Sequence, residues 1–251
     1  MNCCRRLSYW TLPGNLLKAV SVESVVNHNY GVQYPHKAQA CPFMTLALKR
    51  TVKIYTKTGD KGTSSLFTGE RKVKSNEVFH ALGDIDELNS NIGLAIETLK
   101  ESWQVDNFTD ITSFLKKSQC ILLDVGSCVA TPLSSASEKQ ISRVQFDSSF
   151  VDELEQHIDF YTADLPPLKN FILPGGGKAS SRLHICRSVC RRAERSLAPL
   201  LAGNNIDNAV FCYVNRLSDF FFVAARFAAT MEGHEETVYK KHKVKSNALP
   251  E

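Results

Sequence analysis

The chain has 251 residues, of which 43% are hydrophobic and 22% charged, as in a soluble globular protein with a sizeable core. Its net charge of +4 is concentrated in residues 1–50, which hold six Lys or Arg and one acidic residue, Glu23. The other 201 residues carry 24 basic and 25 acidic groups, so a broad nucleic-acid-binding surface is not expected. No run of 18 apolar residues occurs, which argues against a membrane span.

Residues 1–50 have the composition of a mitochondrial transit peptide. Arginines come early, no acidic residue precedes Glu23, and Pro13 and Gly14 interrupt the one segment that could be a secretory signal. We therefore predict targeting to the mitochondrial matrix. A disordered extension without a targeting role is the alternative.

The segment KIYTKTGDKGTSSLFTG, residues 53–69, holds four Thr, two Ser, three Gly and three Lys. Hydroxyls, exposed backbone amides and lysines are the groups that bind phosphate. An ordinary surface turn has the same composition, so the segment alone does not decide between the two.

Apolar residues recur with helical periodicity in five segments, about 75–100, 106–130, 147–164, 178–202 and 207–232. Proline, glycine and serine separate them, most clearly in FILPGGGKASS before the fourth segment. No convincing strand pair is present. The sequence predicts an all-α protein, a bundle of five helices.

The fourth segment carries five arginines between Arg182 and Arg195, and three of them, Arg187, Arg191 and Arg195, are spaced four residues apart. Arginine offers a bidentate fork for phosphate or carboxylate. A salt-bridged surface stripe explains the pattern equally well. Together with the hydroxyl-rich loop, the arginines favour a nucleoside polyphosphate as the ligand.

Two further polar sets stand on predicted helices. Asn215, Asp219 and Arg226 interrupt a Phe- and Ala-rich helix, and we expect them to face partners, with the arginines of segment 178–202 as candidates. Asp84, Asp86 and Glu87 lie near the polar side of the first helix, where a carboxylate could pair with an arginine locally or across a subunit boundary.

Several familiar sites are not supported. Gly177-Lys178 is followed by Ala179, which breaks the P-loop pattern, and no Gly-x-Gly-x-x-Gly follows a strand. The seven His form no ligand cluster, so no metal bound by protein side chains is expected. The eight Cys show no Cys-x-x-Cys spacing, and Cys186 and Cys190 share an apolar stripe with Ala193; buried free thiols in a reducing compartment are expected.

Four motifs in order, YTKTGDKGTSSLFTGERKVK, LGDIDELNSNIGLA, FILPGGGKASSRLHICRSVCRRAER and NRLSDFFFVAAR, resemble the corrinoid (cob(I)alamin) adenosyltransferase family of the PduO type, in its animal mitochondrial form. The resemblance covers nearly everything from Lys53 to Glu232. It implies a homotrimer with active sites between subunits. It also implies transfer of the 5′-deoxyadenosyl group of ATP, with Mg²⁺, to cob(I)alamin, which a reductase would generate from cob(II)alamin. Triphosphate would be released, and the product would be supplied to methylmalonyl-CoA mutase.

The same resemblance implies the site residues. Those expected at ATP are Thr56, Lys57, Thr58, Gly59, Ser64, Ser65, Lys74, Arg191, Arg192, Ala193, Glu194, Arg195 and Asn215. Asp86 is expected to pair with Arg187 across the subunit interface, and Phe171 to press on the lower face of the corrin, with plain core packing as its alternative. Arg191 and Arg195, with Phe171, Asp86 and Arg187, are the catalytic candidates.

The implied organisation is a transit peptide in 1–50, a helical domain in 51–235 with its ATP loop in 51–74, and a flexible tail in 236–251. Two other classes of function remain. One is a different ATP-using enzyme such as a kinase, and the other is a cobalamin carrier without enzymatic activity.

Overall fold

The computed structural model describes residues 55–101 and 108–241, so the predicted transit peptide lies outside the described residues. The chain divides into two compact units between Lys61 and Gly62. Residues 55–61, in the first unit, are described by themselves below. Among the described residues, the helices and strands all belong to the second unit.

The second unit contains two short strands and six helices. They are β1 Thr63–Ser65, β2 Arg71–Val73, α1 Glu77–Lys100, α2 Thr109–Val129, α3 Glu138–Ile141, α4 Ser149–Ala163, α5 Gly177–Ala202 and α6 Asn208–Met231.

The five long helices match the five predicted segments within three residues at each end, which confirms the predicted fold class. Side-chain caps set two of the starts: the Asn76 side chain accepts from the backbone N–H of Val78 at α1, and that of Asp207 accepts from Ala209 at α6. Gly203 follows α5 and closes it.

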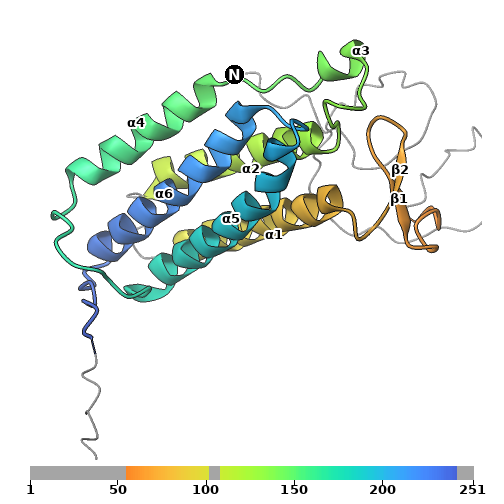
Figure 1. Ribbon diagram of the computed structural model, residues 1–251. Coiled ribbons are helices and arrows are strands. Elements are labelled where there is room, and N and C mark those ends of the chain that lie inside the picture. The colour runs from red at the N-terminus through yellow and green to blue at the C-terminus, as the bar shows by residue number, and fades with distance from the viewer. Residues whose placement is uncertain (1–54, 102–107, 242–251) are drawn as a thin grey trace, which may run out of the picture. The chain divides into compact units, whose positions relative to one another are not determined.

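Helices α5 and α6 form the centre of the bundle (Figure 1). Helix α1 packs on α5, α4 packs on α6, and α2 packs on α1 and touches α6. Helix α6 is the most apolar of the five, because Phe220, Phe221 and the alanines around them are buried on several of its sides. The predicted thiol stripe is confirmed, since Cys186, Cys190 and Ala193 are fully buried in α5. Burial raises the pKa of the Cys186 thiol to about 12.

The hydroxyl-rich segment and the residues directly after it form an antiparallel hairpin, β1–β2, that the sequence pattern did not predict. Leu66 in its turn is 5% exposed and belongs to the main core, while the backbone N–H of Phe67 donates to the carbonyl of Ala130, 2.9 Å away. The hairpin is thereby held at the end of the bundle where α1 begins and α2 ends (Figure 1). The loop that precedes α5 lies at the opposite end.

Residues 236–239, here called the C-terminal strap, run beside the loop before α5. Ile172 and Val238 form an antiparallel bridge, with Leu173 N–H donating to Thr237 O and Tyr239 N–H to Phe171 O, both at 2.8 Å. These are the first residues of the segment expected as a flexible tail, and residues 242–251 lie outside the described part of the chain. Within the described residues no helix is long and apolar enough to cross a membrane.

Candidate functional site

The arginines predicted to act together lie on one exposed stretch of α5. Arg191 and Arg195 are exposed, and the Arg195 guanidinium donates to the carbonyl of Arg191, 2.9 Å away. Neither has a carboxylate partner among the described residues, so their charge is available to a ligand. The alternative of a salt-bridged stripe therefore does not hold for these two.

Arg192, one residue on, faces α1 instead. Its Nε donates to Asp84 Oδ1 at 3.1 Å and its Nη2 to Glu87. The hydrogen bond with Glu87 is the main reason that the pKa of Arg192 is raised further. Ser196 Oγ donates to the second oxygen of Asp84 at 2.5 Å. Arg192 thus holds α5 to α1, and the local pairing expected for the α1 carboxylates is made by Asp84 and Glu87.

Asn215 reaches the same region from α6, since its side-chain amide donates to Glu194 Oε1 at 2.8 Å. Asp219 and Arg226 do face partners, as expected, but the α5 arginines as those partners are wrong. Asp219 pairs with Arg216 on its own helix at 3.2 Å, and Arg226 pairs with Glu236 of the strap at 2.5 Å. Each charge is thus met by an opposite charge elsewhere, and neither residue makes an ion pair with α5.

Asp86 and Arg187 make no ion pair with any described residue of the chain. Asp86 lies about 200° round α1 from Asp84, so it is directed away from α5 and is exposed. Arg187 is half-buried, its Nε has no partner among the described atoms, and its guanidinium lies 5.9 Å from the centre of the Phe222 ring. Neither side chain is therefore neutralised by an ion pair within the described part of the chain.

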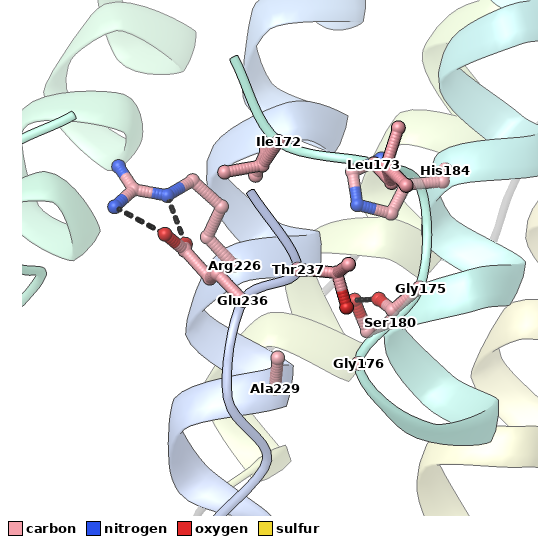
Figure 2. A pocket seen from close by; sticks show the side chains of 10 residues that line it. All are labelled: Ile172, Leu173, Gly175, Gly176, Ser180, His184, Arg226, Ala229, Glu236 and Thr237. Atoms are coloured by element: carbon pink, nitrogen blue, oxygen red, sulfur yellow. Dashed lines mark hydrogen bonds and ion pairs between the residues drawn. The ribbon is translucent and has the colours of Figure 1, made fainter. Parts of the chain in front are cut away.

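Phe171 is 85% exposed, so the alternative of core packing is wrong. It begins residues 171–177, here called the Phe171 loop, which are the last part of the connection from α4 and the first residue of α5. Leu173, Val238 and Tyr239 beside it are also between 42% and 52% exposed. The C-terminal end of the loop is fixed, because Ser180 Oγ donates to Gly175 O at 2.6 Å (Figure 2). An aromatic ring is therefore presented to solvent from a tethered backbone.

A groove of about 440 Å³ runs along α5 from Pro174 to Arg195. Pro174 of the Phe171 loop lies at its beginning, His184 and Ser188 follow, and Arg192 and Arg195 lie at its far end. From Gly177 to Arg195 the helix rises about 27 Å. The groove has the volume of a small-molecule site, with an apolar end and a basic end.

Three further residues predicted to bind ATP lie in the β1–β2 hairpin or directly after it. Ser64 and Ser65 are half-buried, and Lys74 is exposed, with its N–H bonded to Gly62 O at 2.9 Å. Arg71 occupies part of this hydroxyl set, since its guanidinium donates to Ser65 Oγ at 3.1 Å and to Thr63 Oγ1 at 2.6 Å.

Residues 55–61 of the first unit hold the other predicted ATP residues. Thr56 and Thr58 share a hydrogen bond of 2.9 Å between their hydroxyls. Lys57 has a φ of 58°, the left-handed conformation that non-glycine residues rarely adopt, and its ammonium lies 5.9 Å from the Tyr55 ring centre. Gly59 is half-buried. A backbone outlier at a lysine is the kind of strain that often marks a ligand-binding turn.

No cluster of three or more His, Cys, Asp or Glu that could hold a metal occurs among residues 55–101 and 108–241. The oxygen-rich groups of the hairpin are hydroxyls rather than carboxylates, which suit phosphate better than a tightly held cation.

Residues 54–228 match the family described as cobalamin adenosyltransferase. The chain belongs to this family. Corrinoid adenosyltransferase MMAB of mouse (Mus musculus) is 53% identical over 192 residues, which cover 76% of this chain and 79% of the mouse protein. The corrinoid adenosyltransferase of Bacillus subtilis is 42% identical over 190 residues, covering 76% of this chain and 93% of its own.

Solved structures of the family agree in fold. A phenylalanine-to-alanine variant of the PduO-type ATP:corrinoid adenosyltransferase from Lactobacillus reuteri, complexed with cobalamin and ATP, superimposes with a TM-score of 0.68 at 36% identity. The match covers 75% of this chain and all of that one. An arginine-to-lysine variant of the same enzyme, complexed with ATP, gives a TM-score of 0.66 at 34% identity, over 74% of this adenosyltransferase and all of the other chain.

The sequence did not reveal two parts of this adenosyltransferase's site region. One is the Arg192 pairing with α1, and the other is the C-terminal strap beside Phe171. The carboxylates Asp84 and Glu87, one turn apart, were the signal for the first. For the second the signal was a lone arginine, Arg226, in an apolar helix.

Proposed function

We propose that this protein transfers the 5′-deoxyadenosyl group of ATP to cob(I)alamin, forming adenosylcobalamin and releasing triphosphate. The observation that carries the proposal is the groove on α5, which has Arg195, without a carboxylate partner among the described residues, at one end, and at the other end Pro174, three residues after the exposed Phe171. A polyphosphate requires the first feature and a large, flat, partly apolar corrin requires the second.

The chemistry explains why no catalytic triad is needed. Co(I) supplies the electron pair that forms the cobalt–carbon bond, and the bond between C5′ and the triphosphate oxygen breaks with its pair leaving on triphosphate. The nucleophile therefore belongs to the substrate, and the protein must orient C5′ and neutralise the leaving group. We assign the second task to Arg191 and Arg195, together with Lys57 and Lys74 of the ATP loop.

We further propose that Mg²⁺ arrives on the ATP phosphates, where it supplies additional charge neutralisation. The remaining ATP contacts are assigned to Thr56, Thr58, Gly59, Ser64, Ser65, Ala193, Glu194 and Asn215, with Arg192. The Asn215–Glu194 hydrogen bond and the pairing of Arg192 with two carboxylates support a positioning role for these three residues.

We assign Phe171 to the lower face of the corrin. An aromatic ring there would exclude the benzimidazole base and water from cobalt, which raises the cobalt reduction potential and makes Co(I) accessible from cob(II)alamin. Its 85% exposure and the exposed Leu173 beside it support this assignment.

We propose that the active sites form between subunits of a homotrimer. Within one subunit the hairpin and the Phe171 loop lie at opposite ends of the bundle (Figure 1), yet ATP and corrin must meet in the reaction. Asp86 and Arg187, which lack an ion-pair partner among the described residues, are proposed to pair across the interface. We also propose the mitochondrial matrix as the location, a reductase as the source of electrons, and methylmalonyl-CoA mutase as the recipient of the product.

The test is anaerobic. The full chain is mixed with ATP, Mg²⁺ and chemically reduced cob(I)alamin, and the visible spectrum is followed. Conversion to the alkylcobalamin spectrum is the expected result. Release of ADP would instead indicate a kinase, and bound corrin without conversion would indicate a carrier.

A further inference from the structure

Arg226 is the most deeply buried charged residue that the proposed chemistry does not use. It is 5% exposed, near the end of α6. Its Nε donates to Glu236 Oε1 at 2.5 Å, and its Nη2 donates to Glu236 Oε2 at 3.4 Å and to the Pro166 carbonyl at 2.7 Å (Figure 2 shows the Glu236 pair). A buried guanidinium needs such partners, so the positions of the strap and of the α4–α5 connection depend on it.

The strap is in turn bonded to the backbone of the Phe171 loop. Tyr239 N–H donates to the carbonyl of Phe171 itself, and Leu173 N–H donates to Thr237 O, both at 2.8 Å. Figure 2 shows Ile172 and Thr237 on adjacent, extended segments, with Arg226 and Glu236 on one side of them. From Glu236 to Tyr239 is three residues, about 10 Å of extended chain.

Two further contacts of the loop also come from α6 and the chain that follows it. Gly176 has a φ of +88°, and a Cβ there would lie 2.7 Å from Cβ of Ala229. Gly177 has a φ of +91°, and a Cβ there would lie 2.5 Å from the His234 ring. At these two glycines the loop backbone therefore lies directly against the end of α6 and the residues that follow it, while the side chain of Phe171 is exposed.

We propose that Arg226 and Glu236 are positioning residues for Phe171, acting through the strap to hold its ring at the height and angle at which it meets the corrin. The inference rests on the proposed function for Phe171. Without the Arg226–Glu236 pair, the strap is held to the Phe171 loop by its two backbone hydrogen bonds. Because these hydrogen bonds are close to solvent, they should then open more often. A ring that moves by about 1 Å no longer excludes the axial base.

Two variants separate this role from general stability. Glu236→Ala removes the partner of Arg226, and Glu236→Gln, which keeps one oxygen acceptor, should restore part of the function. Tyr239→Pro removes the N–H that bonds to Phe171, at a residue that is 52% exposed, whereas Tyr239→Ala keeps this N–H. Glu155→Ala is the matched control, because it removes a different Arg–Glu pair, that with Arg216 at 2.9 Å.

The first readout needs no ligand. Amide hydrogen exchange at Leu173 should accelerate by about tenfold or more in Glu236→Ala and Tyr239→Pro, and stay within about twofold of the wild type in Tyr239→Ala and Glu155→Ala. Unchanged exchange at Leu173 in Tyr239→Pro, or in a folded Glu236→Ala protein, would show that the strap does not hold the Phe171 loop and would overturn the proposal.

The second readout is the axial ligand of bound cob(II)alamin, observed by EPR through the nitrogen splitting that disappears when the base leaves. Glu236→Ala and Tyr239→Pro should lower the base-off fraction and reduce turnover from cob(II)alamin plus reductant by about tenfold. Turnover of supplied cob(I)alamin and the KM for ATP should stay within about twofold. A wild-type base-off fraction in a variant whose Leu173 exchange has risen would overturn the inference.

Failure of the proposed function can be distinguished from failure of the positioning role. If the wild-type protein makes no adenosylcobalamin from supplied cob(I)alamin, the proposed function fails. The positioning role is still judged by Leu173 exchange and by the spectrum of the bound corrin.

Discussion

Arg192 of α5 donates to Asp84 of α1 at 3.1 Å, whereas Arg191, its neighbour in the chain, has no carboxylate partner in the described part of the protein. The two side chains lie about 100° apart on the same helix. One turn of α5 thus carries one arginine that is held by α1 and one whose charge is left for a ligand, and the two should respond differently to substitution.

Arg191→Ala and Arg192→Ala form the matched pair for this division. Arg192→Ala removes a pair of half-exposed salt bridges and should lower the free energy of unfolding by about 1 kcal/mol, measured by urea denaturation. Arg191→Ala should change stability by less than about 0.5 kcal/mol, yet reduce kcat/KM for ATP at least about tenfold. Equal effects of the two substitutions on both quantities would contradict the division.

Phe171→Ala should leave ATP binding unchanged and impair the reaction of the corrin. The KM for ATP is expected to stay within about twofold, while turnover from cob(II)alamin plus reductant falls by about tenfold or more, because the base is no longer excluded from cobalt. Phe160→Ala is the control, since Phe160 is an aromatic residue on α4 that is 62% exposed. A loss of ATP affinity in Phe171→Ala would show that the ring is misassigned.

Asp86 and Arg187 should be coupled through the subunit interface. Asp86→Ala and Arg187→Ala are each expected to weaken trimer assembly, and the double variant should be little worse than either, because each single change already removes the pair. Sedimentation against concentration gives the assembly constants. Additive losses, or trimers as stable as the wild type, would exclude the pair. Glu97→Ala, which breaks an exposed pair with Lys100, serves as the control.

The free energy of unfolding should depend on pH through His184. Burial, then Arg187, lower its pKa, and Glu236 opposes this shift. The folded protein therefore keeps His184 neutral, while the unfolded chain takes up the proton first as the pH falls below about 6.5. The free energy of unfolding should fall below that pH with a slope of up to about 1.4 kcal/mol per pH unit for this group.

Urea denaturation between pH 7 and pH 5 measures that slope. His184→Gln should reduce it, and so should His157→Gln, because burial also lowers the pKa of His157. The same slope in the wild type and in both variants would mean that neither histidine contributes.

The Phe171 loop should be intolerant of a side chain at Gly176. Gly176 and Gly69 share a φ of +88°, so an alanine is strained at both positions. Only at Gly176 does the new Cβ also meet a neighbour, Ala229, at 2.7 Å. Gly69→Ala should cost about 1 kcal/mol, and Gly176→Ala about 2 kcal/mol more, measured by thermal or urea denaturation. Equal losses would mean that the loop moves aside freely.

The helices were predictable because each buries one stripe of a 3.6-residue pattern, as with Cys186, Cys190 and Ala193 in α5. The β1–β2 hairpin was not, since three-residue strands show no alternation. Its position is set by single contacts, such as buried Leu66 and the Arg71 side chain across Thr63 and Ser65. Helix α3, four residues long, is similarly set by a capping box between Ser137 and Gln140.

The site was predictable in its residue types and less so in its pairings. The spacing of Arg187, Arg191 and Arg195 indicated a common face, but which arginine meets Asp84 depends on how α1 and α5 are rotated against each other. The partner of Arg226 lies ten residues on, beyond the end of α6, where helical periodicity gives no information. A buried arginine in an apolar helix predicts a partner without identifying it.

Adenosyl transfer requires a definite phosphate product from each turnover, so counting that product is the direct test of the proposed function. The full chain, ATP, Mg²⁺ and a limiting amount of cob(I)alamin would be mixed anaerobically, and the products counted by ³¹P NMR against the alkylcobalamin absorbance. We predict one triphosphate for each adenosylcobalamin formed, and loss of both in step in Arg191→Ala. ADP, or free phosphate without a new cobalt–carbon bond, would contradict the claim.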